Sequence, residues 1–156
     1  MLSFAVGEGV FNYRVVGVLI HADRVLLQRA DSDDFWALPG GRGEFGEASG
    51  DTIRRELREE IGLDVAPERL LWVVENFFDL KRPYHEISLY YALRWLGALP
   101  AEETFPGRSE DRDPPITFRW TALTDLDRIR LYPSFLAQAL LHLPTQVTHI
   151  VHRDHN

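Results

Sequence analysis

The stretch that decides the fold is "GRGEFGEASGDTIRRELREEIGL", residues Gly41 to Leu63. Its second half predicts an amphipathic helix over residues 48–61. On an ideal helix, which turns about 100° per residue, Ile53, Leu57 and Ile61 fall within about 80° of one another and form an apolar stripe. The charged side chains are sorted by sign on the remaining surface, with one basic wall and one acidic wall. The acidic wall consists of Glu56, Glu59 and Glu60.

The acidic wall is costly for an ordinary helix. Glu56 lies one turn from both Glu59 and Glu60, and each like-charged pair destabilises a helix by roughly a few tenths of a kcal/mol. From the helix alone, two interpretations stay open. The first is a solvated charged face with glutamate–arginine pairing, which is the usual meaning of a charge run. The second is an oxygen-rich anionic surface of the kind that Mg²⁺ or Mn²⁺ prefers.

The residues upstream of the helix favour the second interpretation. Gly41 is followed after five residues by Glu47, and after seven more by Arg55-Glu56-Leu57. Glu59-Glu60 and Gly62-Leu63 then follow, each after one further residue. This spacing resembles the signature of the Nudix hydrolases at every fixed position. The resemblance covers most of the chain, because the flanking strands also suit that fold.

The resemblance to Nudix hydrolases implies a fold, an activity and a cofactor. The fold is an α/β/α sandwich, with a mixed β-sheet between helices. The activity is hydrolysis of a pyrophosphate bond in a nucleoside diphosphate linked to another group, with Mg²⁺ as cofactor and Mn²⁺ as a substitute. Glu47 and Arg55 are implied to be a structural pair that braces the loop against the helix. The implied metal ligands are Glu56, Glu59, Glu60 and a backbone carbonyl near Gly41.

The general base is left open between a glutamate of the signature and one elsewhere. Glu86 is the preferred candidate outside the helix, because it opens a long strand and sits among aromatic residues. A plain surface carboxylate is the alternative reading of Glu86. Its neighbour His85 fits a structural or substrate-contacting role better than that of a base. The remaining candidates are Glu44, Glu47, Glu75, Glu102, Glu103 and Glu110.

Substrate contacts are predicted from arginines near turns and from aromatic residues. Candidate phosphate-binding residues are Arg29, Arg42 and Arg82, although each also fits an ordinary surface position. Aromatic rings can stack on a base. The favoured pocket residues are Phe35, Phe77, Phe78 and Tyr84. The four tryptophans lie in apolar strand patterns, so we expect core packing for most of them: Trp36, Trp72, Trp95 and Trp120.

The rest of the chain predicts one domain, residues 1–156, in which strands dominate. A short strand broken by a turn at Gly40-Gly41 precedes the helix, and a second amphipathic helix is expected over residues 134–143. Residues 1–11 are predicted to be an N-terminal strand or arm, residues 100–115 a mobile loop and residues 144–156 a polar tail. The longer predicted strands are 13–20, 25–30, 68–80, 85–96 and 116–123, of which the first two form a hairpin.

Composition limits the function classes. The net charge of −7 disfavours binding to duplex nucleic acid, and an anionic nucleotide would need cations supplied locally. The absence of cysteine excludes disulfides and thiolate zinc sites. We see neither a signal peptide nor a membrane-spanning run, so the expected location is the cytoplasm. A homodimer stays open, with the segment before Tyr13 as a candidate interface.

Two further questions remain at this stage. The alternative to an enzyme is a non-catalytic Nudix-like module that senses a nucleotide, but such a module would be expected to lose signature glutamates, and all are present. The tail carries His149, His152 and His155 at three-residue spacing, which on a helix would be a weak candidate for a metal site. The sequence does not choose among nucleoside triphosphates, nucleotide sugars and other diphosphates.

Overall fold

The strands form two sheets in the computed structural model, which describes residues 1–108 and 113–154. The larger sheet has six strands, in the order β1-β2-β7-β6-β10, with β5 paired to β2. It is mixed, because β2 runs parallel to β7 while β6 runs antiparallel to β7. Its strands are β1 (Ser3–Val6), β2 (Gly9–Val18), β5 (Gly40–Arg42), β6 (Asp64–Asp79), β7 (Pro83–Leu96) and β10 (Thr148–Asp154).

The smaller sheet is antiparallel and has four strands, in the order β3-β4-β9-β8. Three helices complete the described chain: α1, the 3₁₀ helix η1 and α2. Their bounds are Ser49–Ile61 for α1, Leu123–Arg128 for η1 and Leu136–Ala139 for α2. The strands of the smaller sheet are β3 (Ile20–His21), β4 (Arg24–Ala30), β8 (Thr104–Pro106) and β9 (Ile116–Ala122).

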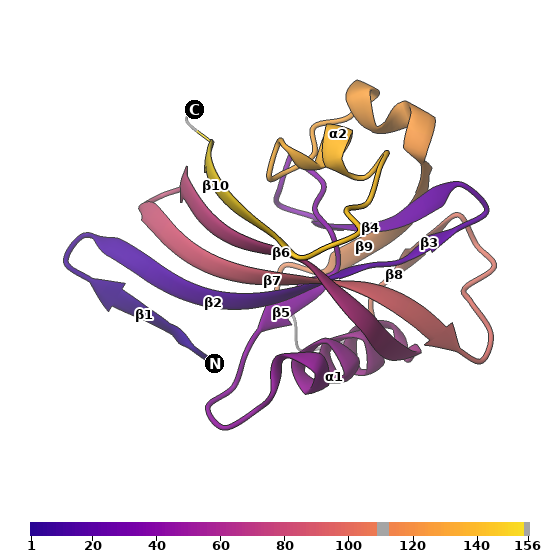
Figure 1. Cartoon of the computed structure of the whole chain (residues 1–156), viewed down its shortest axis with the longest axis horizontal. Coiled ribbons are helices and arrows are strands. Elements are labelled where there is room, and N and C mark those ends of the chain that lie inside the picture. The colour runs from indigo at the N-terminus through magenta and orange to yellow at the C-terminus, as the bar shows by residue number, and fades with distance from the viewer. Residues whose placement is uncertain (109–112, 155–156) are drawn as a thin grey trace.

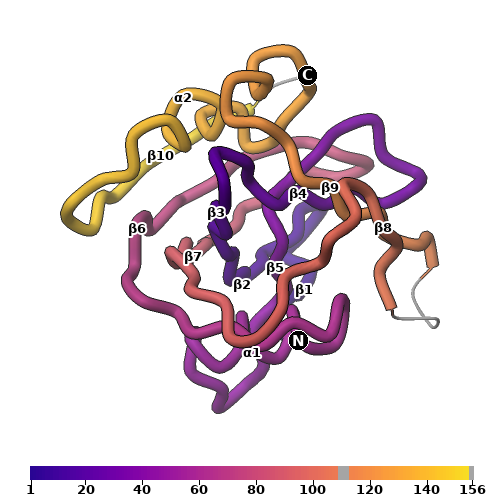
Figure 2. Tube along the Cα trace, turned by 90° about the vertical axis from the view of Figure 1, so that its right-hand side faces the viewer, coloured from indigo at the N-terminus to yellow at the C-terminus, as the bar shows by residue number. Residues whose placement is uncertain are grey.

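The helices lie on opposite sides of the sheet layer, with α1 on one face and α2 on the other (Figures 1 and 2). Alternation along β2 builds a core on each side, because successive strand residues point to opposite faces. Val15, and Leu19 directly after the strand, belong to the apolar cluster that contains Leu57 of α1. Val16 belongs to the cluster that contains Leu136 of α2. The predicted α/β/α sandwich with a mixed sheet is confirmed.

Helix α1 follows the predicted pattern closely. Its apolar stripe is buried, with Ile53 and Leu57 at 0% and 1% exposed. Gly62 ends the helix at a φ of 67°, a left-handed conformation that favours glycine. The amide groups of Gly62 and Leu63 then donate to carbonyls of the last turn. The helix is therefore held rigidly at the end that follows its glutamates.

Two predictions about the strands around α1 are wrong. The hairpin joins only β3 to β4, while β2 leaves for the larger sheet and pairs with β7. Gly40 and Gly41 do not form a turn but lie inside β5, paired with β2. Close approach explains the two glycines, because a Cβ on Gly40 would lie 2.3 Å from the carbonyl oxygen of Val15.

The second helix is much shorter than predicted. The apolar spacing predicts a helix over residues 134–143, but α2 spans only Leu136–Ala139. Leu136 is the fully buried residue of α2, Leu140 directly after the helix is also buried, and Leu141 is 43% exposed. Pro144 disfavours helical geometry at the residue before it, and the chain must turn there to enter β10.

The predicted polar tail is also wrong, because β10 pairs in parallel with β6 along its whole length. On a strand, residues three apart point to opposite faces, which excludes the helical metal site proposed for the tail histidines. His149 contacts Glu75, whereas His152 lies against Asp154. His155 lies outside the described residues.

The remaining predicted segments have these positions. Within residues 100–115, predicted to be a mobile loop, Thr104–Pro106 form β8 alongside β9, and residues 109–112 lie outside the described residues. β1 lies at an edge of the larger sheet and pairs with β2 of its own chain, so a homodimer through that edge stays a prediction. None of the helices within residues 1–108 and 113–154 is long and apolar enough to cross a membrane.

Candidate active site

Glu56 projects from α1 against the backbone of β5. A Cβ on Gly41 would lie only 2.0 Å from the side-chain carboxyl carbon of Glu56, so that carboxylate occupies the space a larger residue would fill. The Glu56 side chain is 13% exposed. Burial is the main cause that raises its pKa, and the charge of Arg55 opposes that rise. The protein therefore holds a poorly hydrated carboxylate beside a glycine backbone.

Arg55 connects the loop before α1 to the helix carboxylates. Its Nε and Nη2 atoms donate to the two carboxylate oxygens of Glu47, at 2.8 and 3.1 Å. Nη1 donates to Glu56 at 3.0 Å and to Glu59 at 3.3 Å. These contacts lower the pKa of Glu47 to about 2, with the hydrogen bond from Arg55 as the largest cause. The predicted Glu47–Arg55 pair is thus in bidentate contact.

The other two helix glutamates differ in exposure. Glu59 is 58% exposed, so its side chain is free to adopt several rotamers. Glu60 is only 7% exposed and lies toward Gly107, where a Cβ would be 3.5 Å from its Oε2 atom. The backbone carbonyl of Glu60 accepts a hydrogen bond from the amide of Arg108, at 2.6 Å. The segment that follows β8 therefore lies against the C-terminal turn of α1.

These residues fit a divalent cation in composition but are not gathered around one point. Carboxylate and backbone carbonyl oxygens are suitable ligands for Mg²⁺, and the glycine at position 41 keeps its backbone open to Glu56. Within residues 1–108 and 113–154, no group of three acidic or histidine side chains is close enough to hold an ion. Arg55 instead bridges Glu56 and Glu59. Gathering the glutamates requires the exposed Glu59 to change rotamer.

A cavity of about 380 Å³ lies on the face of the larger sheet opposite α1. None of the α1 residues lines it. Gly41 and Arg42 are neighbours on β5, so their side-chain directions alternate, and Gly41 faces α1 while Arg42 lines the cavity. The end of β5 therefore joins the helix glutamates to the cavity.

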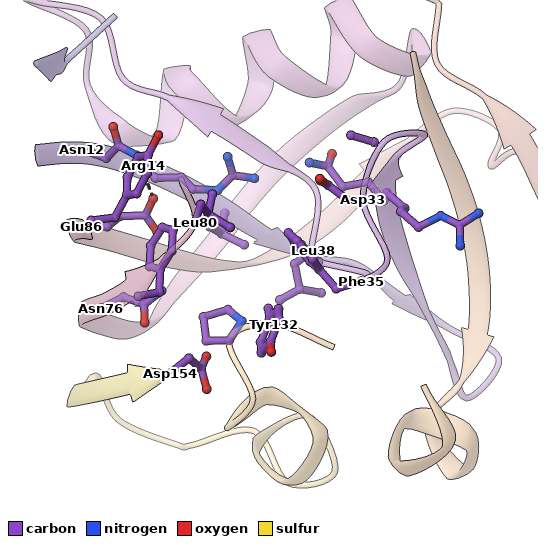
Figure 3. Close-up of a pocket in the computed structure, with 18 of the residues that line it drawn as sticks. Asn12, Arg14, Asp33, Phe35, Leu38, Asn76, Leu80, Glu86, Tyr132 and Asp154 are labelled. Carbon is purple, nitrogen blue, oxygen red and sulfur yellow. Dashed lines mark hydrogen bonds between the residues drawn. The ribbon is translucent and has the colours of Figure 1, made fainter. Parts of the chain in front are cut away.

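Six of the residues predicted to contact substrate or act in catalysis line this cavity together. Phe78 and Tyr84 are stacked on one another, with ring centroids 5.0 Å apart. Phe35 packs edge-on against Tyr132, at 5.1 Å. Figure 3 shows Phe35 and Tyr132 at one end of the cavity and Glu86 at the other. The six are Arg29, Phe35, Arg42, Phe78, Tyr84 and Glu86.

A polar row on the cavity floor was not predicted from the sequence. In the sheet register, Asn12 of β2 pairs with Glu86 of β7, which pairs with Asn76 of β6. All three are buried, at 4%, 6% and 4% exposed, and all three line the cavity (Figure 3). The signal was present as polar residues inside apolar strands, but only the strand order shows that they are neighbours.

Arg14 is a second residue that sequence reasoning missed. It pairs with Arg42 in the register of β2 and β5, and both line the cavity. Arg14 is also close enough to Glu56 for its charge to lower the pKa of that carboxylate. Two arginines therefore stand at the end of the cavity nearest the helix glutamates. This placement supplies the local cations that a net-negative protein needs for an anionic substrate.

Arg29 and Arg82, the other candidate phosphate contacts, have separate surroundings. The Arg29 guanidinium lies 4.7 Å from the ring centroid of Trp36, and Arg119 lies 4.1 Å from the same ring. The Nε–H group of Arg29 is buried and donates to none of the described residues. Arg82 does not line the cavity. It donates instead to the carbonyls of the turn between β1 and β2, at Gly7, Glu8 and Gly9.

The other candidate bases are dispersed. Glu44, in the loop before α1, pairs with the N-terminal amine. Glu75 pairs with His149 on the face of the larger sheet away from the cavity. Glu102 lines a second hollow beside Gly62. Glu103 accepts a backbone hydrogen bond from Trp120, and Glu110 lies outside the described residues. Of the candidate glutamates outside the signature that the structure describes, only Glu86 lines the main cavity.

Comparison with known proteins gives three informative similarities. YjhB of Bacillus subtilis (strain 168), whose name suggests ADP-ribose pyrophosphatase activity, is 34% identical over 80 residues, which are 50% of this chain and 38% of that protein. An 8-oxo-dGTP diphosphatase of Buchnera aphidicola subsp. Schizaphis graminum is 25% identical over 144 residues, 88% of each chain. The crystal structure of a MutT Nudix hydrolase from Burkholderia pseudomallei has a TM-score of 0.62 at 25% identity, covering 85% of this chain and 98% of that one.

A carboxylate-bearing helix that β5 joins to a cavity with paired arginines suits a pyrophosphohydrolase, and the comparisons assign the protein to that class. The family follows directly: the NUDIX domain matches residues 12–141, and the chain belongs to the Nudix hydrolases. Enzymes of this family act on pyrophosphate bonds of nucleoside diphosphate derivatives and use divalent metal ions. The family resemblance inferred from the signature is thereby confirmed.

Proposed function

We propose that the protein hydrolyses, with Mg²⁺ as cofactor, a pyrophosphate bond in a nucleoside diphosphate linked to another group. The observation that carries this proposal is the position of β5. One of its neighbouring residues, Gly41, faces the Glu56 carboxylate, while the next, Arg42, lines the cavity beside Arg14. A diphosphate over this strand would have arginines on one side and the helix carboxylates on the other.

The residues of the proposed metal site are Glu56, Glu59, Glu60 and the backbone at Gly41. When bound, Mg²⁺ neutralises phosphate oxygens and lowers the barrier to attack by water. The chain itself holds Glu56 in place by packing it on Gly41 and by the hydrogen bond from Arg55. Mn²⁺ is expected to substitute, because it accepts the same oxygen ligands.

The phosphate chain is proposed to lie against Arg14 and Arg42. Both arginines line the cavity and are paired in the sheet register. Arginine favours such a role because its planar donors match phosphate oxygens in a bidentate arrangement. The nucleoside would then extend into the cavity, between the Phe78–Tyr84 stack and the Phe35–Tyr132 pair.

The base that activates water stays a prediction among the three helix glutamates and Glu86. The buried position of Glu86 in the cavity, on the face of the sheet away from α1, supports substrate contact more directly than a role beside the helix carboxylates. The names of the relatives do not identify a substrate for this protein. The name of YjhB refers to ADP-ribose, whereas the name of the Buchnera protein refers to 8-oxo-dGTP. We therefore propose the reaction class without one named substrate.

The test is a panel of nucleoside triphosphates, nucleotide sugars and dinucleotides, assayed with Mg²⁺, with Mn²⁺ and with chelator. We expect release of a nucleoside monophosphate and a phosphate-containing product that requires the metal. Glu68→Gln is the control for substitution of a helix glutamate such as Glu56→Gln. Glu68 is exposed on β6 and pairs only loosely with Arg94, at 3.5 Å. Tight binding of a nucleotide with no turnover under any condition would contradict the enzyme and support a nucleotide sensor.

A further inference from the structure

The floor of the cavity is a row of three buried polar side chains on adjacent strands. Asn12, Glu86 and Asn76 stand side by side in the register of β2, β7 and β6. On one side of the row, two residues away along the strands, lie the aromatic rings of Phe78 and Tyr84, and on the other side lies Arg14. Buried polar groups need hydrogen-bond partners, because an unpaired one loses its contacts with water and gains nothing in return.

Glu86 has fewer partners than a buried carboxylate ordinarily has. Its Oε1 atom accepts a hydrogen bond from the Ser88 hydroxyl at 2.8 Å. Its Oε2 atom accepts only a long one, from the Asn12 amide at 3.4 Å. No arginine, lysine or histidine within residues 1–108 and 113–154 forms an ion pair with it. An ionised carboxylate has about four acceptor sites, so at least one side of Glu86 can accept further N–H donors.

Asn76 adds a second acceptor to the same band. Its Oδ1 atom is buried and accepts a hydrogen bond from none of the described residues. Asn76 lines the cavity, and the terminal torsion of its side-chain amide is broad, so this oxygen can turn toward a ligand. The floor thus offers two acceptors next to one another. A ligand that fits would carry two or more neighbouring N–H groups along one edge.

The position of the floor matches the base end of a nucleotide. The Arg14–Arg42 row lies two residues further along β2, about 6.6–6.8 Å from the Asn12 row. On the other side of the floor lies the Phe78–Tyr84 stack. A nucleotide whose phosphates lie on the arginines therefore brings its base over Glu86, beside aromatic rings.

We propose that Glu86 and Asn76 determine specificity, by accepting hydrogen bonds from the lactam N–H and the exocyclic amine of a guanine-type base. This inference rests on the proposed function, since it uses the same cavity. Guanine carries these two donors side by side: the lactam N–H and one amine hydrogen match the two oxygens of the Glu86 carboxylate, and the second amine hydrogen is left for Oδ1 of Asn76. Adenine carries a ring-nitrogen acceptor beside its amine, which would face the carboxylate without a proton between them. Cytosine has the same mismatch, and uracil carries a single ring donor.

The test is calorimetric titration of the protein with GMP and with AMP in the presence of a metal chelator. Neither monophosphate contains a pyrophosphate bond, so the titration measures binding without turnover. Wild-type protein should bind GMP at least about tenfold more tightly than AMP. Glu86→Gln should weaken GMP binding about ten- to hundredfold and remove most of that preference, because a charged hydrogen bond is lost. Glu75→Gln is the matched control: Glu75 lies on β6, next to Asn76, but on the far face of the sheet with His149. It should keep wild-type selectivity.

Equal affinity of the wild type for GMP and AMP would overturn the inference without any variant. Selectivity that persists in a folded Glu86→Gln protein would overturn it as well. If instead kcat collapses in Glu86→Gln while GMP affinity is unchanged, Glu86 acts on the reaction and not on recognition. The proposed function fails separately, by absence of Mg²⁺-dependent turnover, since selective binding in chelator does not depend on catalysis.

Discussion

The carboxylate of Glu56 occupies the space in which Gly41 would carry a Cβ atom. That atom would lie 2.0 Å from the carboxyl carbon of Glu56 and 2.3 and 2.4 Å from its two oxygens. These distances are far below a van der Waals contact, so any side chain at position 41 must displace the carboxylate. The glycine of the signature therefore protects the position of a proposed metal ligand.

Gly41→Ala tests this relationship. We expect kcat/KM to fall at least about hundredfold, because a displacement of about 1 Å in a catalytic group can have that effect. The double variant Gly41→Ala with Glu56→Asp should regain thermal stability, because the shorter side chain makes room, but not activity. Wild-type activity in the single variant would show that the position of Glu56 is unimportant.

The Glu47–Arg55 pair predicts a pH-dependent stability. The pKa of Glu47 is lowered in the folded protein from 4.5 to about 2, mainly by the hydrogen bond from Arg55. A carboxyl group whose folded pKa is lowered stabilises the protein above its unfolded pKa, and this contribution is lost as the pH falls toward the folded value. The shift corresponds to roughly 3 kcal/mol at most at neutral pH.

Glu47→Gln should therefore be less stable than the wild type at pH 7, and the difference should shrink between about pH 4.5 and pH 2. Urea unfolding across that range measures it. Asp51→Asn is a suitable control, because Asp51 forms only an exposed pair with Arg54, at 3.2 Å. A difference between Glu47→Gln and wild type that stays constant with pH would contradict the assignment.

Arg14 is predicted to hold the phosphates of the substrate. Arg14→Met should raise KM about tenfold or more with a smaller effect on kcat, because a bidentate charged contact is lost. Arg94→Met is the matched control, since Arg94 is an exposed arginine on β7 that pairs with Glu68 away from the cavity. Steady-state kinetics of the two variants separate a local contact from a general loss of positive charge. Equal effects in both would contradict the proposed role.

The core predicts a large stability difference between two leucines. Leu57 is 1% exposed beneath α1, and Leu57→Ala should lower the free energy of unfolding by about 2–5 kcal/mol. Leu141, which follows α2, is 43% exposed, and Leu141→Ala should cost less than about 1 kcal/mol. Denaturant unfolding compares them directly. Similar losses in both variants would mean that α1 is not packed as described.

The sequence predicted α1 well because its signals are local, whereas the sandwich was implied by the resemblance of the signature to that of the Nudix hydrolases. Helical periodicity alone predicts the apolar stripe of Ile53 and Leu57. A glycine at position 62 alone predicts that the helix ends there in a left-handed conformation. The glycines of β5 were misread as a turn, because glycine for close approach and glycine for a turn look alike until the packed neighbour is known. For α2, the apolar spacing was present, but the path into β10 left room for one turn only.

The candidate site divides in the same way. The helix glutamates and the Glu47–Arg55 pair follow from a motif within one segment. The sequence does not show that Arg14 lies in the site or that Asn12, Glu86 and Asn76 form one row, because β2 is far from β6 and β7 in sequence. Their proximity depends on strand order and register, which the chain does not show locally.

The central claim is that metal-dependent hydrolysis depends on the α1 carboxylates. Its most direct test is the rate of nucleoside monophosphate release as a function of Mg²⁺ concentration, in wild type and in Glu56→Gln and Glu59→Gln variants shown to be folded. The account predicts turnover in the wild type that saturates with Mg²⁺ and is abolished by chelator, and a loss of at least about hundredfold in both variants. A turnover rate that does not depend on Mg²⁺ concentration, or near wild-type rates in either variant, would contradict this claim.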